Sequence, residues 1–460
     1  MNLFTTKSLA QLDQDAERNP LRRSLGRVQL MALGVGSIIG TGIFVLTGTA
    51  ASQNAGPALV LSMILTTIGC AFSGLCYVEF AAMVPIAGSA YTYAYATIGE
   101  FIAWIIGWDL ILEYALSVST VAVGWSGYFV SLTHDLGINI PLALTMPYGR
   151  VVTDQSGAMV TGVFNLPAAC IVVFVSALLI SGIRQSANAN TVLVFIKAMV
   201  LVVFVVAGAA YVKRANLTPF IPPNTGEFGH FGLSGILRGA GVMFFAYIGF
   251  DAVTTAAQES RDPQRDMPWG ILGSLAICTV LYIAVAIVLT GIVHYSKLNV
   301  ADPLAVGIDA TGLRWLSPVI KVSALFGLFS TMLVQLLGQT RIFFQWHVTG
   351  TVCLLVAGLT PIEVLGQLVS IGTLLAFVLV CAGVVILRKT APGNRRPFRT
   401  AWVPLVPILG ALICLAQMLG LPGETWIRLV IWLAVGLVIY FAYGHSHAQA
   451  ARVEAGKATS

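Results

Sequence analysis

The feature that most constrains this chain is a series of long apolar runs in which charged residues are nearly absent. Only 10% of the 460 residues are charged, against about 25% in an average soluble protein, so charge is too scarce to cover a water-facing surface. Several runs reach roughly 20 residues, which is enough to cross about 30 Å of hydrocarbon as an α-helix. The sequence therefore predicts an all-α polytopic membrane protein.

The hydropathy pattern predicts twelve membrane spans, and an even number places both termini on one side. With the N-terminus inside, Lys and Arg are roughly twice as frequent in the inner segments as in the outer ones, which is the bias of the positive-inside rule. We therefore expect a multi-pass protein of the inner (plasma) membrane with both termini cytoplasmic. The predicted ranges are 29–50, 58–82, 98–131, 163–181, 190–212, 235–257, 269–293, 314–344, 348–361, 364–387, 401–420 and 425–443.

We interpret the net charge of +6 as a signal for the orientation of the chain in the membrane, not for an acidic partner, because the basic residues lie between the apolar runs. We expect the lipid bilayer as the surrounding partner, and no nucleic acid. The seven cysteines form no CxxC pair, which favours small apolar residues over metal ligands. No phosphate-binding loop, metal spacing or nucleophile–base pair is evident, so we expect no cofactor and no enzyme activity.

The stretch GVGSIIGTGIF, residues 34–44, interrupts the first predicted span with glycines. One interpretation is close helix packing through the G-x-x-x-G pair Gly36 and Gly40. The other is a broken helix, since clustered glycines unwind easily and unwound backbone is tolerated in a membrane where it lines a cavity. Freed N–H groups near Gly40, Thr41 and Gly42 would attract a carboxylate, and freed carbonyls would attract an ammonium. A zwitterionic amino acid carries both.

A broken-helix transporter needs a second break in the matching span of an inverted half. Residues 241–260, GVMFFAYIGFDAVTTAAQES, provide the candidate five spans later. Gly249 lies in mid-span there, and Asp251 is a charge that a lipid-facing helix would not hold. The first and sixth spans run in opposite directions, as an inverted repeat requires.

With these two breaks, the chain resembles the amino acid–polyamine–organocation superfamily, near the bacterial relatives of the cationic amino acid transporters. The stretches that carry the resemblance are GVGSIIGTGIFVLTG, YVEFAAMVPIAGSAYTYAYATIGE, IIGWDLILEY, FFAYIGFDAVTTAAQES, RDPQRDMPWGI, LLGQTRIFF and LVSIGTLLAFVLV. The resemblance implies a five-plus-five inverted-repeat helical bundle with two extra C-terminal helices and alternating access to a midplane site. Its parts would be a cytoplasmic tail 1–27, repeats 28–213 and 235–388, the extra helices 401–443, and a second cytoplasmic tail 444–460.

The resemblance also implies the positions of the substrate contacts. The substrate carboxylate would meet the N–H groups of Thr41 and Gly42. Phe245 resembles the aromatic gate over the substrate. The carbonyls expected to meet the ammonium are those of Ile38, Phe245, Ala246 and Ile248.

Lys197 is the one charge inside the apolar run TVLVFIKAMVLVVFVVAG. It could snorkel, because it lies only about 10–15 Å of helix from the cytoplasmic end of its span. It could instead face the bundle and exchange a proton, since burial disfavours a charged amine. Similar proton-coupled transporters place a lysine in this helix where sodium-dependent relatives bind an ion. This resemblance implies proton-linked, sodium-independent transport.

Three carboxylates lie within predicted spans. Asp109 and Glu113 are four residues apart and share a helix face, while Asp251 belongs to the sixth span. They could form helix-bridging hydrogen bonds, or they could serve cation preference or proton transfer as charge partners of the lysine. Of the three carboxylates, Glu113 is the first candidate for a functional role, because it should lie near the middle of the bilayer.

The chain departs from the family after LLGQTRIFF, where a cytoplasmic linker of a few tens of residues is nearly absent. The ninth span keeps only about ten apolar residues, or roughly 15 Å of helix. We expect a secondary active amino-acid transporter with a shortened ninth helix. The alternative is a non-transporting or impaired relative, either sensor-like or inactive. A channel ranks third, because nothing builds a continuous polar pore.

Overall fold

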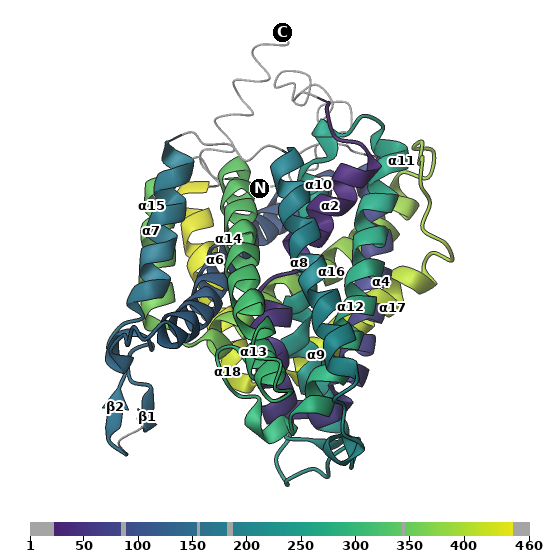
Figure 1. Cartoon of the computed structure of the whole chain (residues 1–460). Helices are drawn as coiled ribbons and strands as arrows, with labels where there is room; N and C mark the ends of the chain where they lie inside the picture. Colours follow the sequence, from purple (N-terminus) through teal and green to yellow (C-terminus); the bar gives the residue numbers. More distant parts are fainter. Residues whose placement is uncertain (1–22, 84–88, 154–156, 182–186, 343–345, 445–460) are drawn as a thin grey trace.

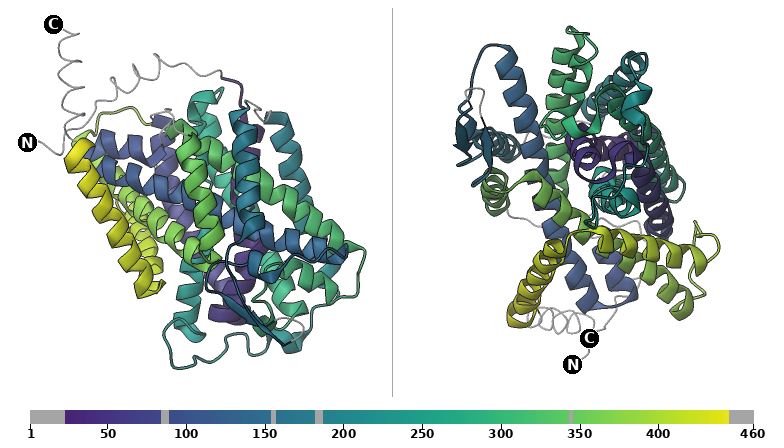
Figure 2. Two further views of the ribbon diagram at one scale, coloured as in Figure 1. Left: turned by 90° about the vertical axis from the view of Figure 1, so that its left-hand side faces the viewer. Right: turned by 90° about the horizontal axis from the view of Figure 1, so that it is seen from below.

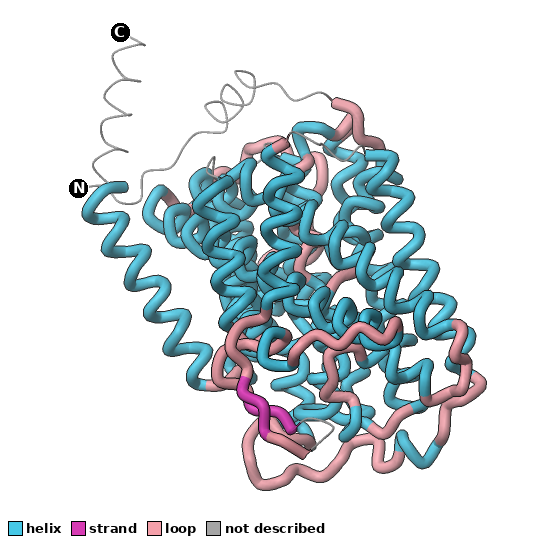
Figure 3. Tube along the Cα trace, turned by 60° about the vertical axis from the view of Figure 1, so that its left-hand side comes forward, coloured by secondary structure: helices cyan, strands magenta, loops and turns pink. Residues whose placement is uncertain are grey.

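The long apolar runs form helices because a helix satisfies its own backbone hydrogen bonds, as a hydrocarbon environment requires. The computed structural model describes residues 23–83, 89–153, 157–181, 187–342 and 346–444. Most helices run roughly along one common direction in a bundle (Figure 1). Of the described residues, those in strands form one antiparallel hairpin, β1 Val151–Thr153 with β2 Met159–Thr161, at the margin of the bundle (Figure 3).

The bounds of the helices follow in chain order. They are α2 Arg27–Ile38, η1 Gly42–Leu46, α3 Thr47–Ala50, η2 Ala51–Ala55, η3 Gly56–Ala58, α4 Leu59–Met83, α5 Ser89–Thr97, α6 Glu100–Asp135, η4 Leu142–Leu144, α7 Leu166–Ile180, α8 Ala187–Ala209, η5 Arg214–Leu217, α9 Gly232–Met243, η6 Phe244–Tyr247 and α10 Ala252–Thr255. The second group is η7 Ala257–Glu259, α11 Pro263–Pro268, η8 Trp269–Gly273, α12 Ser274–Ile292, η9 Tyr295–Lys297, α13 Pro303–Asp309, α14 Leu316–Ile342, α15 Trp346–Leu359, α16 Ile362–Thr390, α17 Leu405–Gly420, α18 Gly423–Ile439 and η10 Tyr440–Gly444.

Within the described residues, eight helical stretches are long and apolar enough to cross a membrane, and four shorter apolar helices accompany them. Each of the twelve predicted ranges overlaps one of these helices. The chain is thus a helical multi-span membrane protein. Large apolar side chains stay exposed along α8 and α18, as lipid-facing surfaces require. Examples are Phe195, Met199, Val206, Ile427, Val430 and Val438.

The first predicted span is not one helix. Helix α2 ends at Ile38, Ile39 has an extended backbone (φ −71°, ψ 96°), and the helix resumes as η1 at Gly42. The sixth span is also interrupted, since η6 ends at Tyr247 and α10 begins at Ala252, with Gly249 at φ +119° between them. Both predicted breaks are confirmed, and an uninterrupted glycine-packed first helix is excluded.

The ends of the predicted spans differ from the observed helices by a few residues, and two of the helices need comment. Helix α17 begins at Leu405 rather than at residue 401, because residues 401–404 form turns. Helix α15 has 14 residues and follows α14 after only three positions. At about 1.5 Å per residue it is roughly 21 Å long, so the ninth helix is short.

The last two helices, α17 and α18, lie at one edge of the bundle when it is seen from below (Figure 2). They pack on α16, and α17 also contacts α4 and α9. The irregular segments, in contrast, have helices around them: η6 contacts α4, α9 and α16, and the end of α2 accepts hydrogen bonds from side chains of α8, α12 and α14. The fold therefore surrounds both helix breaks with continuous helices.

Candidate functional site

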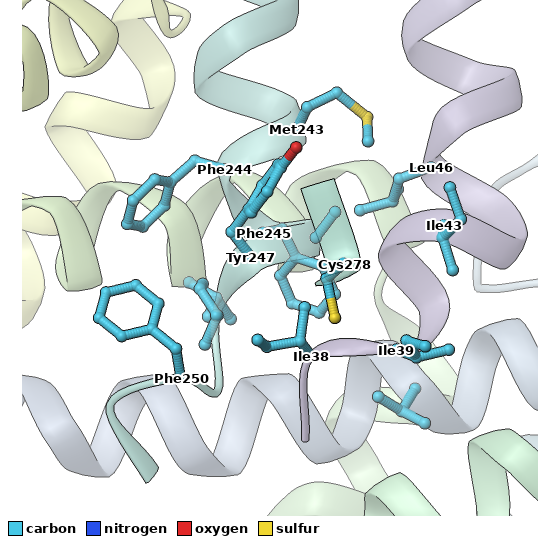
Figure 4. Packing of buried hydrophobic residues seen from close by; sticks show 14 of the residues in the cluster. Ile38, Ile39, Ile43, Leu46, Met243, Phe244, Phe245, Tyr247, Phe250 and Cys278 are labelled. Carbon is cyan, nitrogen blue, oxygen red and sulfur yellow. The ribbon is translucent and has the colours of Figure 1, made fainter. Parts of the chain in front are cut away.

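The two helix breaks lie against each other in the middle of the bundle. Figure 4 shows the segment that carries Ile38 and Ile39 beside the one that carries Phe244 to Tyr247. The approach is close enough that a Cβ on Gly42 would collide with Cα and Cβ of Ala246. A Cβ on Gly249 would lie 2.8 Å from the carbonyl carbon of Ser37. Glycine is therefore required at both contacts by space, and at Gly249 also by its positive φ.

A small cavity lies between the breaks. Its volume is about 10 Å³, roughly the room that one water molecule needs. The residues that line it are Ser37, Ile38, Gly40, Thr41, Gly42, Val121, Phe245, Ile248, Thr331 and Gln335. The structure thus brings together six of the seven predicted substrate contacts. The seventh, Ala246, packs directly behind Gly42.

Helix α2 leaves carbonyls without intrahelical partners where it ends. Side chains of helices far away in the sequence donate hydrogen bonds to these carbonyls. The Tyr282 hydroxyl of α12 donates to the Ile38 carbonyl at 2.8 Å. Thr331 Oγ1 donates to the Ile39 carbonyl at 3.1 Å. One predicted ammonium contact, Ile38, is therefore already engaged, although a carbonyl keeps a second lone pair.

The second break is held by its own residues. The Ile248 N–H donates to the Phe245 carbonyl at 3.3 Å, and Gly249 N–H donates to Asp251 Oδ1 at 3.2 Å. The Thr254 side chain donates to the Asp251 carbonyl. Asp251 therefore closes a local turn at the start of α10, and the roles expected for it in helix bridging, cation preference or proton transfer stay predictions.

Lys197 of α8 is fully buried and points at the first break. Its Nζ donates to the Gly36 carbonyl at 2.5 Å, to the Ile39 carbonyl at 3.0 Å and to Thr331 Oγ1 at 3.1 Å. An ammonium has three donors, and all three are matched here. Snorkelling is excluded by this burial. Among the described side chains, no carboxylate lies within ion-pair distance of Lys197.

The three carboxylates are all buried, each at most 4% exposed. Asp109 lies against α16, where a Cβ on Gly372 would be 2.6 Å from its Oδ1. Glu113 lies four residues further along α6 and is within electrostatic range of both Asp109 and Asp251. The sequence placed Asp109 and Glu113 on one face but gave no position for Asp251 relative to them.

Sequence reasoning missed four residues of the cavity: Ser37, Val121, Thr331 and Gln335. Two of them gave a signal, because Thr331 and Gln335 are polar, four residues apart and on one face of an apolar helix. Thr41 Oγ1 and Gln335 Oε1 are buried without a hydrogen-bond partner. Buried polar atoms seldom stay unpaired, so these two atoms leave unused hydrogen-bonding capacity in the lining of the cavity.

Residues 25–352 match the model described as "Amino acid permease", and residues 398–448 match "C-terminus of AA_permease". The chain is 42% identical to the "Methylthioribose transporter" of Bacillus subtilis (strain 168), over 97% of this chain and 98% of the relative. It is also 42% identical to "Branched-chain amino acid permease BcaP" of the same organism, over 97% and 99%.

A plant relative is more distant. The chain is 34% identical to "Cationic amino acid transporter 4, vacuolar" of Arabidopsis thaliana, over 81% of this chain and 64% of the relative. The resemblance inferred from the quoted motifs is therefore confirmed, with higher identity to the two bacterial relatives than to this plant one.

Proposed function

This chain belongs to the amino acid permease family, a family of transporters and not of enzymes, and from that premise we propose a particular carrier function. The protein takes up apolar branched-chain α-amino acids across the inner (plasma) membrane, with both termini cytoplasmic. Uptake is coupled to protons and independent of sodium. The α-carboxyl and α-amino groups of the substrate bind at the two helix breaks.

The observation that carries this proposal is the small cavity between two interrupted helices. N–H groups at the start of η1, at Gly40–Gly42, suit a carboxylate. Carbonyls of Ala246 and Ile248 in the opposite break suit an ammonium. Between them, the Thr41 hydroxyl is buried without a partner, and a bound carboxylate or ammonium would supply one. The ends of this cavity thus complement a zwitterion.

The apolar walls of the cavity support an aliphatic substrate side chain. Val121 of α6, Phe245 and Ile248 line it, and a branched hydrocarbon buries well against such surfaces. An aliphatic substrate is also supported by the branched-chain amino acid permease of Bacillus subtilis, which is 42% identical over almost its whole length. Phe245 is then the aromatic residue that closes over the bound substrate.

Lys197 is the candidate for proton coupling. Its three hydrogen bonds hold the end of α2 to α8 and α14. Loss of a proton would remove one donor and the positive charge, and the end of α2 would be released. No carboxylate among the described residues compensates the buried charge, which makes the neutral form accessible. Asp109, Glu113 and Asp251 stay candidates for cation preference or for proton transfer.

The size of the cavity requires movement. With about 10 Å³ it cannot admit an amino acid, so the breaks must separate for substrate to enter or leave. We infer that the first five helices, 28–213, and the next five, 235–388, form the two inverted repeats, with 401–443 outside them. Each repeat begins with an interrupted helix, which is the arrangement that alternating access uses.

Uptake into proteoliposomes tests the proposal. With an acid exterior and no sodium, L-leucine should accumulate above the external concentration, and a protonophore should abolish the accumulation. Excess isoleucine or valine should compete, whereas arginine should not. Competition by methylthioribose alone would contradict an amino-acid substrate, and accumulation only with sodium would contradict the coupling.

The short α15 favours one alternative, a relative that binds substrate but transports it poorly or not at all. Helix α15 spans roughly 21 Å instead of about 30 Å. An insertion of a family-like linker between α14 and α15 should leave uptake unchanged if the short helix is compatible with transport. Leucine binding without accumulation, together with uptake gained on insertion, would instead support the impaired relative.

A further inference from the structure

A groove between α16 and α17 shares no lining residue with the central cavity. Its volume is about 330 Å³, within the usual range of small-molecule sites. Ile408 and Leu412 in its wall are exposed, so the groove opens on the surface of the bundle. We propose that this groove and the basic segment 388–399 beside it bind one anionic phospholipid. The lining residues are apolar or small: Cys381, Ala382, Val385, Ile386, Pro407, Ile408, Ala411 and Leu412.

The segment 388–399 carries five basic residues and no acidic one. Because α16 ends at Thr390 and α17 begins at Leu405, the chain passes the end of the groove between these two helices. As proposed for the orientation of the chain, this end faces the cytoplasm. Clusters of Lys and Arg at that membrane surface attract anionic lipid headgroups. The charge of the segment therefore favours a lipid with a negatively charged headgroup.

Two of the five basic side chains are used within the protein. Arg388 donates to both carboxylate oxygens of Glu79 of α4, each at 2.9 Å. Arg396 donates to the carbonyls of Leu387 and Ala391 at 3.2 Å and 2.8 Å. These bonds fold the segment onto α4 and onto the end of α16. The segment is thus a fixed platform at the end of the groove.

The other three basic side chains, Lys389, Arg395 and Arg399, are exposed. In the part of the chain that the structure describes, none of these three forms an ion pair. Lys389 lies on the face of α16 that lines the groove, because Ala382, Val385 and Lys389 follow the helical spacing of three and four residues. Positive charge at one end of an apolar groove matches a phosphate that is joined to a hydrocarbon chain.

The two parts of the lipid contribute differently to its affinity. An acyl chain gains no hydrophobic free energy when it moves from the bilayer into the groove, since lipid tails are as apolar as the groove walls. It gains only close packing along roughly 8 Å of α16, from Cys381 to Ile386. The headgroup charges should therefore supply most of the affinity, and the groove should fix the position of the chain.

Native mass spectrometry of the full-length protein in detergent, titrated with dioleoyl-phosphatidylglycerol, tests the inference. The wild type should bind one such lipid at least roughly tenfold more tightly than dioleoyl-phosphatidylcholine, which has no net charge. The variant Lys389→Gln/Arg395→Gln/Arg399→Gln should lose this preference. Its melting temperature without added lipid should match that of the wild type, because the three side chains are exposed.

A matched control and a second variant separate charge from shape. The control Lys213→Gln/Arg214→Gln/Arg314→Gln also removes one lysine and two arginines that are exposed, and it should keep the preference. Ala382→Phe/Ala411→Phe fills the groove and leaves the basic residues in place. This variant should bind dioleoyl-phosphatidylglycerol roughly threefold more weakly. Glycerol 3-phosphate, which has no acyl chain, should not displace the lipid at equal concentration.

Several outcomes would overturn the inference. They are equal binding of the two lipids by the wild type, an unchanged preference in the triple glutamine variant at 389, 395 and 399, and unchanged affinity in the filled groove. Displacement by glycerol 3-phosphate would show a site for free phosphate instead of a lipid. A dimer that is lost when the groove is filled would show a contact between two copies of the chain. The measurement requires no transport, so its result does not depend on the proposed carrier function.

Discussion

The backbone groups that the two helix breaks leave free find their hydrogen-bond partners in different ways. Where α2 ends, the freed carbonyls are satisfied by Lys197, Tyr282 and Thr331, which lie more than a hundred residues away in the sequence. Where η6 ends, the hydrogen bonds join Phe245 with Ile248 and Gly249 with Asp251, which are two or three residues apart. Side chains of the surrounding helices stabilise the first break, whereas hydrogen bonds within its own segment stabilise the second.

This difference indicates which break can transmit a change to the rest of the protein. Protonation or displacement of Lys197 alters contacts among α2, α8 and α14 together. A change within the turn at Gly249 alters mainly that turn. We therefore expect substitutions at the first break to affect coupling, and substitutions at the second to affect local stability and binding.

The largest expected effect is that of Lys197→Met on proton-driven uptake. The substitution removes three hydrogen bonds and leaves two buried carbonyls with fewer donors, at about 1–3 kcal/mol each. Net leucine uptake driven by a pH gradient should fall roughly 100-fold, while leucine–leucine exchange should be affected less. Lys297→Met, at the exposed end of η9, is the control. Gradient-driven uptake that survives in Lys197→Met would refute the coupling role.

Gly249→Ala should have the next largest effect, on stability. Alanine at φ +119° is strained, and its Cβ would lie 2.8 Å from Ser37, so we expect a loss of about 2–4 kcal/mol. A lowered melting temperature in detergent would show it. Gly312→Ala is a matched control, because Gly312 also has a positive φ, +82°, but no neighbour within 4 Å of the added Cβ. Equal losses in both variants would mean that the contact between the breaks contributes nothing.

The contrast between the breaks also explains what the sequence could predict. The breaks themselves were predictable, because glycine clusters and a mid-span aspartate are local features of residues 34–44 and 241–260. The burial of Lys197 was one of two predicted outcomes. Its acceptors, Gly36 and Ile39, lie in the stretch that was singled out, but the pairing depends on how α8 packs on α2.

The helices that surround the site were harder to predict from sequence. Tyr282 lies in an apolar run that shows no sign of a functional residue. Its hydroxyl reaches the Ile38 carbonyl only because α12 packs on α2. Thr331 and Gln335 gave a weak signal as a polar pair on one face. Asp109 and Glu113 both belong to α6, whereas Asp251 precedes α10, so the position of Asp251 relative to them depends on the packing of two distant segments, which no local pattern encodes.

Tyr282→Phe should have a moderate effect at the first break. It removes one hydrogen bond to a carbonyl that α2 cannot satisfy itself, which costs about 1 kcal/mol. The melting temperature should fall slightly, and the apparent leucine affinity should change by about tenfold or less. Tyr128→Phe, which removes a similar bond to the Phe44 carbonyl beyond the break, serves as the comparison. A greater loss of transport in Tyr128→Phe would mean that the broken end of α2 is not the sensitive point.

The smallest expected effect is that of Asp251→Asn at the second break. The amide oxygen of asparagine can accept the Gly249 N–H as the carboxylate does, so the turn keeps its geometry and stability should change by about 0.5 kcal/mol or less. Asp251→Ala removes the acceptor and should cost about 1 kcal/mol more. If Asp251 only closes its turn, leucine uptake and its pH dependence should be unchanged in Asp251→Asn. A shifted pH profile with an unchanged melting temperature would instead show that the negative charge takes part in transport, and the second break would then serve coupling as the first one does.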